Sequence, residues 1–177
     1  MERLWAGWRM EYVAPAKRPG RKAKASCLFC DVAARPRGGR NLVLASTPLT
    51  LVMLNLYPYN VGHVMVAPRR HLGSPAGLNV EEAADVNLWL GRVVDALKRE
   101  YRPHGFNLGA NLGRVSGAGV LGHLHWHVVP RWNGDTNFMP VLAETKVLPE
   151  AIDRTYRRLR KRLDAPSERT RPRRRAR

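Results

Sequence analysis

The chain has 177 residues, 44% of them hydrophobic, and a formal net charge of +17 at pH 7. This length fits one globular domain with extensions, and it is sufficient to bury a core. No apolar run approaches the roughly 18 residues that a membrane-spanning helix needs, and the charged N-terminal segment has no apolar stretch typical of a signal peptide. We therefore expect a soluble, cytoplasmic protein with no membrane contact.

The positive charge is confined to the two ends of the chain. Residues 1–40 contain ten basic and three acidic residues, residues 41–153 contain nine of each, and residues 154–177 contain twelve basic and two acidic residues. The C-terminal tail can contact polyanions weakly through its charge, although such segments are more often solvated and disordered. A basic nucleic-acid-associated protein therefore stays open as an alternative, but the neutral middle of the chain does not favour it.

The first apolar segments of the chain predict strands. Residues 41–46 and 49–56 are apolar and rich in β-branched side chains, and a short break separates them. Residues 57–62 have turn composition, and residues 63–67 predict a third strand.

A long helix is predicted to start at Val80. Asn79 and Glu82 have the spacing of a capping box, in which each side chain accepts a hydrogen bond from the backbone of the other residue. Apolar residues recur at helical spacing over residues 83–97, and Pro103 stops the pattern.

The C-terminal half adds two strands and a second helix. Strands are predicted at 106–112 and 123–129, joined by the glycine-rich segment 113–122, and an amphipathic helix is predicted at about 149–163. This order of elements indicates an α+β fold, with an antiparallel sheet, one long helix and a C-terminal helix.

Three of the six histidines, His123, His125 and His127, occupy alternate positions. Alternate residues of a strand face the same side, so a strand here places the three imidazoles in one row. Histidine is the commonest metal ligand, but the outer two would lie about 13 Å apart at about 3.3 Å per residue. One metal ion can bind two of them at most, which leaves at least one imidazole for another role.

The two cysteines, Cys27 and Cys30, have CxxC spacing. In a cytosolic chain this spacing indicates a metal site or a redox pair before a structural disulfide. Tetrahedral zinc needs four ligands, and His71 and His123 are candidates for the other two. A reduced cysteine pair without metal remains the alternative.

Residues 123–130 resemble the signature of the histidine triad (HIT) proteins, which are nucleotide hydrolases and transferases. Two further segments agree with that family: LNLYPYNVGHVMV, which contains Asn55 and His63, and FNLGANLG at 106–113. The resemblance covers residues 27–140. The opening LWAGWRMEYV and the segment PRWNGDTNF after the triad are similar to the bacterial branch that resembles diadenosine tetraphosphate phosphorylases.

The resemblance implies a HIT-like fold, a homodimer and a division of the chain. Residues 1–26 would be an N-terminal extension, 27–140 the HIT domain, 141–163 a C-terminal helical extension and 164–177 a basic tail. It also implies a structural zinc on Cys27, Cys30, His71 and His123, and no catalytic cofactor. A closed set of four ligands leaves no position for water, so this metal would stabilise the fold and would not take part in the reaction.

The resemblance also assigns roles within the triad. His125 would attack the α-phosphorus of a nucleotide and form a nucleotidyl-histidine intermediate, since a neutral imidazole is nucleophilic near pH 7. His127 would donate a hydrogen bond to the phosphate, and His63 would support the nucleophile from the neighbouring strand. Asn55 would contact the ribose hydroxyls, and Asn111 is a further candidate for that pocket.

The glycine-rich turn is the candidate phosphate-binding segment. The backbone amides at Gly117 and Gly119 can approach phosphate oxygens closely, because no side chain blocks them. Many family members carry Gln followed by Ser or Thr in this turn, whereas this chain has Gly119 and Val120. A side-chain contact to phosphate is therefore absent here or supplied from elsewhere.

These observations predict an enzyme that cleaves dinucleoside polyphosphates, such as diadenosine tetraphosphate, or related nucleotidyl conjugates. The alternatives are a nucleoside phosphoramidase and a nucleic-acid-associated protein whose triad is idle. Hydrolysis, phosphorolysis and transfer share the first half-reaction, so the sequence leaves the acceptor open.

Overall fold

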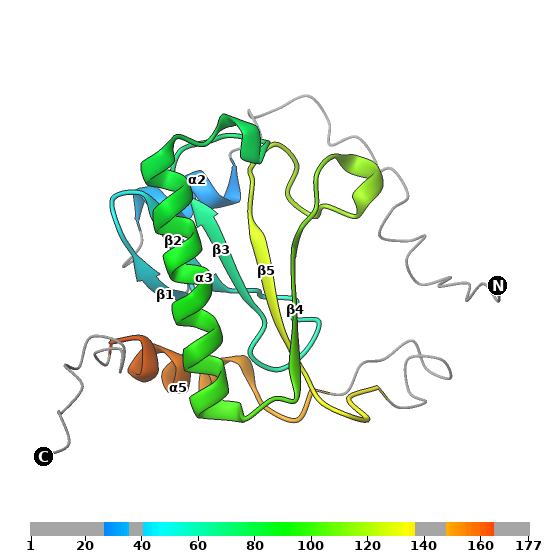
Figure 1. Ribbon diagram of the computed structural model, residues 1–177. Coiled ribbons are helices and arrows are strands. Elements are labelled where there is room, and N and C mark those ends of the chain that lie inside the picture. Colours follow the sequence, from blue (N-terminus) through cyan, green and yellow to red (C-terminus); the bar gives the residue numbers. More distant parts are fainter. Residues whose placement is uncertain (1–26, 36–40, 137–147, 165–177) are drawn as a thin grey trace, which may run out of the picture.

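The computed structural model describes residues 27–35, 41–136 and 148–164. Five strands form one antiparallel sheet in the order β1-β2-β3-β5-β4 (Figure 1). Their bounds are β1 Val43–Ser46, β2 Thr50–Leu54, β3 Val64–Pro68, β4 Gly105–Ala110 and β5 Trp126–Arg131. The predicted α+β class is confirmed.

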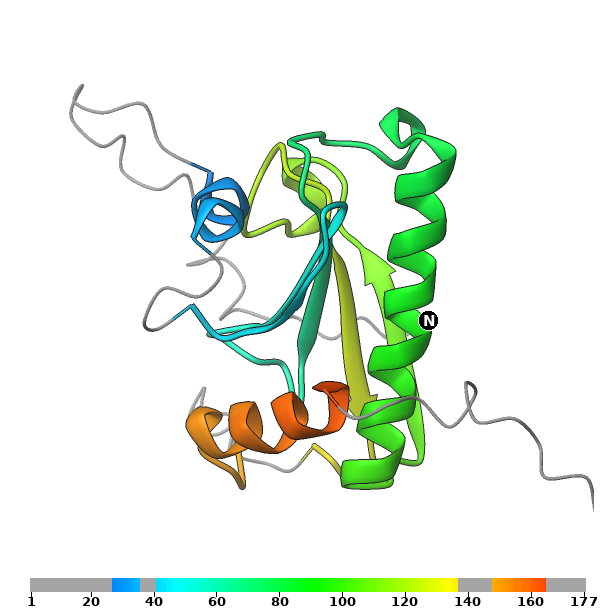
Figure 2. The ribbon, with the colours of Figure 1, turned by 90° about the vertical axis from the view of Figure 1, so that its left-hand side faces the viewer.

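Helices cover the two faces of the sheet unequally (Figure 2). The short helix α2 (Leu28–Ala34) lies on one face and the long helix α3 (Val80–Tyr101) on the other. The C-terminal helix α5 (Ile152–Asp164) packs against both α3 and β1. The two faces are called the α2 face and the α3 face below.

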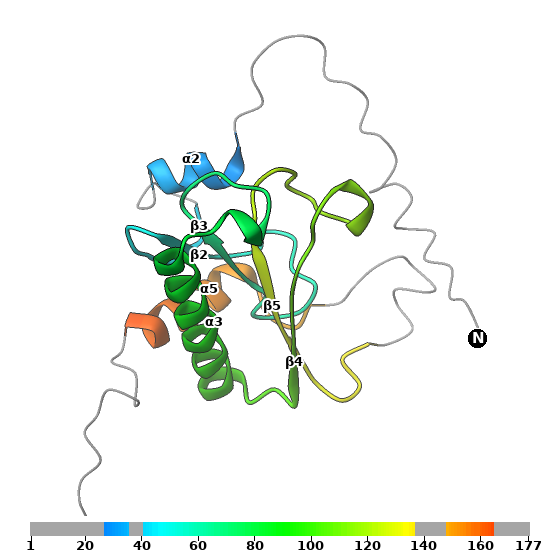
Figure 3. The same cartoon turned by 45° about the horizontal axis from the view of Figure 1, so that its top comes forward.

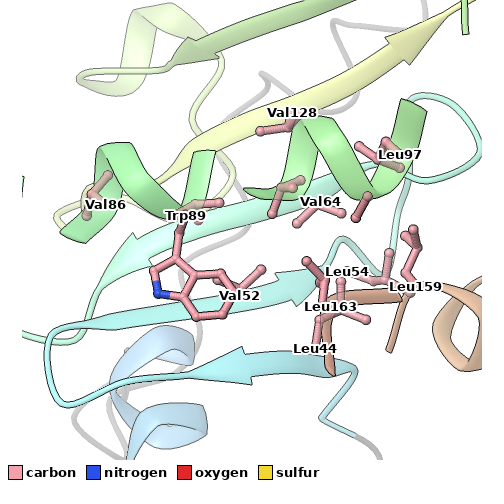
Figure 4. Close-up of a cluster of buried hydrophobic side chains, with 13 residues drawn as sticks. Leu44, Val52, Leu54, Val64, Val86, Trp89, Leu97, Val128, Leu159 and Leu163 are labelled. Carbon is pink, nitrogen blue, oxygen red and sulfur yellow. The ribbon is translucent and has the colours of Figure 1, made fainter. Parts of the chain in front are cut away.

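The larger hydrophobic core fills the α3 face, where side chains of the sheet meet those of α3 and α5 (Figure 4). Because alternate residues of a strand point to opposite faces, only every second strand residue contributes to it. Its buried members are Leu44, Val52, Leu54, Val64, Val66, Val86, Trp89, Val93, Ala96, Leu97, Val128, Leu159 and Leu163.

A smaller core lies on the α2 face. Phe29, Val32 and Ala33 of α2 pack against side chains from the first three strands. The strand residues in this core are Val43, Leu51, Met53, Met65 and Ala67. The candidate site lies beside this smaller core, on the same face.

The start of α3 matches the predicted capping box. Asn79 Oδ1 accepts a hydrogen bond from the Glu82 backbone N–H at 2.8 Å, and Glu82 Oε2 accepts one from the Asn79 N–H at 3.0 Å. The helix ends at Tyr101. The next residue, Arg102, takes a left-handed conformation and directly precedes Pro103.

The structure corrects the predicted histidine strand. β5 begins at Trp126, so only His127 of the triad belongs to it. The preceding segment is held by a loop contact instead, because the Leu124 N–H donates to the Leu72 carbonyl at 2.6 Å. Trp126 packs against the core of the α3 face, so its side chain points away from His127 on the α2 face.

Helix α2 was not predicted. Its seven residues are too few to show a helical hydrophobic pattern, and Cys27 before it makes no side-chain capping hydrogen bond. Residues 1–26 and the tail after Asp164 lie outside the described residues, so the predictions for both stay untested. Among the residues that the structure describes, no helix is long and apolar enough to cross a membrane.

Candidate functional site

A chain of hydrogen bonds fixes two histidines on the α2 face. The Tyr59 backbone N–H donates to His63 Nδ1 at 3.0 Å, so this nitrogen carries a lone pair and the His63 proton is on Nε2. His63 Nε2 lies 2.8 Å from His127 Nδ1 and donates to it. The proton of a neutral His127 is therefore on Nε2, the ring nitrogen that takes no part in these hydrogen bonds.

His125 is held by its own backbone. Its Nδ1 lies 2.8 Å from the His123 carbonyl oxygen, which can only accept, so Nδ1 carries the proton. The lone pair of the neutral ring is then on Nε2. The His125 ring lies between Phe29 and His127, with ring centroids 4.8 and 4.9 Å away. The site thus pairs a nucleophilic nitrogen on His125 with a proton donor on His127.

Burial keeps both imidazoles neutral. His125 is only 3% exposed, and loss of solvent lowers its pKa below the ordinary value of 6.5. Burial, with a smaller contribution from the neighbouring His125, lowers the pKa of His127 to about 4. At pH 7 His125 is therefore unprotonated at Nε2 and able to act as a nucleophile.

A second group of side chains, called the Cys/His cluster, joins α2 to the start of the triad. It consists of Cys27, Cys30, His71 and His123, whose candidate ligand atoms all lie within 4.8 Å of one another. Cys27 Sγ lies 3.2 Å and Cys30 Sγ 3.6 Å from His123 Nδ1, and Cys30 Sγ lies 3.3 Å from His71 Nδ1. This group could hold a metal ion.

The donor set of the Cys/His cluster fits a tetrahedral metal. Bond lengths of about 2.3 Å to sulfur and 2.1 Å to nitrogen place neighbouring ligand atoms about 3.6 Å apart, close to the observed separations. His123 Nε2 lies 2.9 Å from the Pro68 carbonyl and donates to it, which leaves the Nδ1 lone pair directed at the cysteines. The row of histidines is thus divided, with His123 in the Cys/His cluster and the other two outside it.

Comparison with known proteins decides the family. Residues 40–134 match the HIT domain family. The chain belongs to the HIT family. It is 40% identical over 162 residues to a Mycobacterium tuberculosis protein named AP-4-A phosphorylase, a match that covers 90% of this chain and 83% of the relative. The Schizosaccharomyces pombe protein named adenosine 5'-monophosphoramidase hnt1 is 32% identical over 128 residues, covering 72% of this chain and 90% of the relative.

Solved structures agree on the fold. A zinc-bound histidine triad family protein from Mycobacterium smegmatis has a TM-score of 0.62 at 24% identity, covering 78% of this chain and 93% of its own. A hypothetical histidine triad nucleotide-binding protein from Sulfolobus tokodaii has a TM-score of 0.63 at 24% identity, covering 77% of this chain and 91% of its own. The HIT fold is therefore confirmed, and the chain is an enzyme of the nucleotide hydrolase and transferase class that this family comprises.

The predicted nucleotide-binding residues of this HIT protein lie in two separate segments. Asn55 is half-buried, and its Nδ2 lies 3.5 Å from His63 Nδ1. Asn111, Gly117 and Gly119 belong to the segment between β4 and β5, which lies at the same end of the sheet as α2 (Figure 3). Gly117 has a left-handed φ of 84°, as a glycine-rich turn requires. Their roles in binding stay predictions.

Three further residues contact or face the histidines and were not singled out from the sequence. The Tyr59 ring lies 4.6 Å from the His63 ring and 5.6 Å from the His127 ring, measured between centroids. Phe29, between the two cysteines in the sequence, lies against His125. Gly109 of β4 is paired with His127, and a Cβ at Gly109 would have no atom within 4 Å. Only sheet register, which the sequence does not give, places this open space beside His127.

Proposed function

We propose that this HIT protein cleaves diadenosine tetraphosphate by phosphorolysis, with inorganic phosphate as acceptor. The observation that carries the proposal is the lone pair on His125 Nε2 beside the hydrogen-bonded pair of His63 and His127. The similarity to the M. tuberculosis relative supports this choice of substrate and acceptor.

The first half-reaction forms a covalent intermediate on His125. Its Nε2 attacks the α-phosphorus of one adenylyl group, and the bond from that phosphorus to the bridging oxygen breaks. The Nε2–H of neutral His127 donates a hydrogen bond to the oxygen of the departing ATP, which leaves as the triphosphate anion. The His123 carbonyl oxygen then stabilises the positive charge that develops on the adenylated ring, because this oxygen already accepts a hydrogen bond from His125 Nδ1–H.

The second half-reaction transfers the adenylyl group to phosphate. A phosphate oxygen attacks the adenylyl phosphorus, the Nε2–H of His127 donates a hydrogen bond to the reacting phosphates, and the phosphorus–nitrogen bond to His125 breaks. The products are ADP and a regenerated neutral imidazole, so one diadenosine tetraphosphate and one phosphate give ATP and ADP.

The nucleotide would be held by groups around the triad. Asn55, beside His63, would contact the ribose hydroxyls, and Asn111 is the second candidate in that pocket. The amides at Gly117 and Gly119 would bind the phosphate chain. These assignments rest on position and on the chemistry of the groups.

Product analysis tests the proposed function. The purified protein is incubated with diadenosine tetraphosphate, with and without inorganic phosphate, and the nucleotides are separated. ADP and ATP that form only with phosphate support the proposal, whereas AMP and ATP that form without phosphate would identify a hydrolase. A His125→Gly variant should lose turnover while its thermal unfolding stays cooperative, and substantial turnover by that variant would contradict the mechanism.

A phosphoramidase is the second candidate function. The S. pombe relative is named for that activity, and the same covalent intermediate would form when an amine leaves from an adenylyl group. Comparison of kcat/KM for adenosine 5'-phosphoramidate and for diadenosine tetraphosphate separates the two. Removal of residues 164–177 separates both activities from a basic nucleic-acid-associated role with an idle triad. Loss of polyanion binding with intact nucleotide cleavage would support an enzyme.

We propose zinc as the metal of the Cys/His cluster. Two thiolates and two imidazoles at these separations form a donor set that zinc favours. With four protein ligands the metal would fasten α2 to the start of the triad and supply no reactive water. Metal analysis of protein purified without chelators tests this, and a zinc content far below one per chain would contradict it.

For the homodimer predicted from the family resemblance, β4 is a candidate interface. β4 is at the edge of the sheet, and its Leu108 side chain is 49% exposed. An edge strand of this kind can pair with a second copy. Sedimentation equilibrium of the native chain and of a Leu108→Lys variant tests this, and a monomer at all concentrations would contradict it.

A further inference from the structure

The turn between β2 and β3, residues 55–63, is anchored to the end of β5 by one buried amide. The Asn60 side chain is 6% exposed, and its Nδ2 donates to Asp135 Oδ2 at 2.9 Å and to the Pro130 carbonyl at 3.2 Å. The Asn60 carbonyl also accepts the His63 N–H at 3.1 Å. Asn60 therefore links His63 to the strand that carries His127.

Asp135 is itself held firmly. Its side chain is 7% exposed and accepts two hydrogen bonds from Arg131, from Nε at 2.6 Å and from the second terminal nitrogen at 2.8 Å. The Trp132 N–H donates to the same carboxylate at 3.1 Å. Hydrogen bonds between charged groups in this two-pronged geometry are strong and directional, so the carboxylate offers Asn60 an acceptor of fixed orientation.

The anchored turn acts on the histidine pair through Tyr59, the residue directly before Asn60. The Tyr59 N–H holds the lone pair of His63 at Nδ1, and the Tyr59 ring packs against both His63 and His127. A shift of this turn would free His63 to take its other tautomer, with the proton on Nδ1. His63 Nε2 could then no longer donate to His127.

We propose that Asn60 and Asp135 are positioning residues that keep the proton of His127 on Nε2. They do so by fixing the position of the Tyr59 backbone N–H. This N–H selects the tautomer of His63, and His63 in turn selects the tautomer of His127. Neither residue touches the reacting atoms. The catalytic consequence rests on the proposed function, whereas the tautomer itself is a property of the free protein.

The test replaces Asn60 with a residue of the same shape. Asn60→Asp puts a carboxylate oxygen where Nδ2 donates, so it faces the carboxylate of Asp135 and the carbonyl of Pro130. Asn60→Ser removes both hydrogen bonds without adding charge, and it serves as the second variant if Asn60→Asp fails to fold. Asp135→Asn weakens the anchor from the other side.

The matched control removes a hydrogen bond from the same arginine without affecting Asn60. Arg131 donates to the exposed Asn107 Oδ1 at 2.8 Å, and Asn107→Ala deletes this contact alone. This control should keep the wild-type histidine spectrum and the wild-type kcat.

Nitrogen-15 NMR of the histidine rings reports the tautomers directly at pH 8. We expect wild-type His63 and His127 to be protonated at Nε2, and the Asn60 and Asp135 variants to show a mixture of tautomers. With diadenosine tetraphosphate and phosphate, kcat should fall by about 10- to 100-fold and KM should change less than about threefold, since misplaced groups impair the chemical step.

Wild-type ring spectra in the variants, with or without a lower kcat, would overturn the proposal. If the wild-type protein does not cleave diadenosine tetraphosphate, the proposed function fails, but a tautomer change in the variants would still support the positioning role.

Discussion

Gly109→Val should reduce activity without reducing stability. Gly109 pairs with His127 across β4 and β5, and side chains of paired residues project from the same face about 5 Å apart at Cβ. Because no atom lies within 4 Å of a Cβ built at Gly109, valine fits the folded protein. Under the proposed function, its methyl groups would instead occupy the space beside His127 that a substrate phosphate would use.

The size of each effect follows from this geometry. A substrate displaced by about 1 Å can react about 100-fold more slowly, which corresponds to about 2.7 kcal/mol in the activation free energy. Glycine within a strand costs roughly 0.5 to 1 kcal/mol of stability, so the variant should unfold at a temperature about 1 to 4 °C higher.

Gly105→Val is the matched control. Gly105 is in the same strand, no atom lies within 4 Å of its built Cβ, and it is paired with Arg131. It lies four residues from Gly109, about 13 Å along the strand. Both variants should gain stability in calorimetry, and only Gly109→Val should lose kcat/KM for diadenosine tetraphosphate. Equal kcat/KM in the two variants would refute the view that substrate occupies this space.

Gly62→Ala should lower the free energy of unfolding by about 2 to 5 kcal/mol, because φ is +76° and the new Cβ would lie 2.8 Å from Leu97 Cδ2. Gly134→Ala, with φ +72° and no atom within 4 Å, should lose only the about 1 to 2 kcal/mol of backbone strain, and equal losses in urea unfolding would contradict this. Burial that lowers the pKa of His127 from 6.5 to about 4 should make neutral His127 contribute stability that is complete above about pH 6.5 and lost towards pH 4, by up to about 3 kcal/mol. A His127→Gln variant should lose less stability between pH 8 and pH 4 than the wild type, and an equal loss in urea unfolding would argue against it. Cys30→Ser should lower the unfolding temperature by several degrees and remove its sensitivity to a chelator, and a wild-type response would argue against a metal at Cys30.

The elements with strong local signals could be predicted from the sequence. The capping box predicted the start of the long helix at Val80, because two side chains three residues apart each accept a hydrogen bond from the other residue's backbone N–H. The alternating histidines and the CxxC pair indicated two kinds of chemistry, and the structure brings Cys27, Cys30 and His71 together with His123. The roles of these residues stay predictions.

The features that could not be predicted depend on contacts between residues distant in the sequence. The histidine strand begins later than predicted, since Leu124 bonds to Leu72 and not to a neighbouring strand. The anchor between Asn60 and Asp135 joins residues 75 apart. Neither relation leaves a periodic pattern, so hydrophobic spacing and turn composition could not reveal it.

The unequal cores on the two faces of the sheet have a consequence for local opening. Helix α2 has seven residues and only three buried side chains, whereas α3 has 22 residues and packs on the larger core. Segments with few buried contacts open at lower free energy than the whole protein, so amide protons of α2 should exchange with solvent well before those of α3. Since Phe29 of α2 packs against His125, such an opening would expose the His125 ring to water while the rest of the fold remains intact.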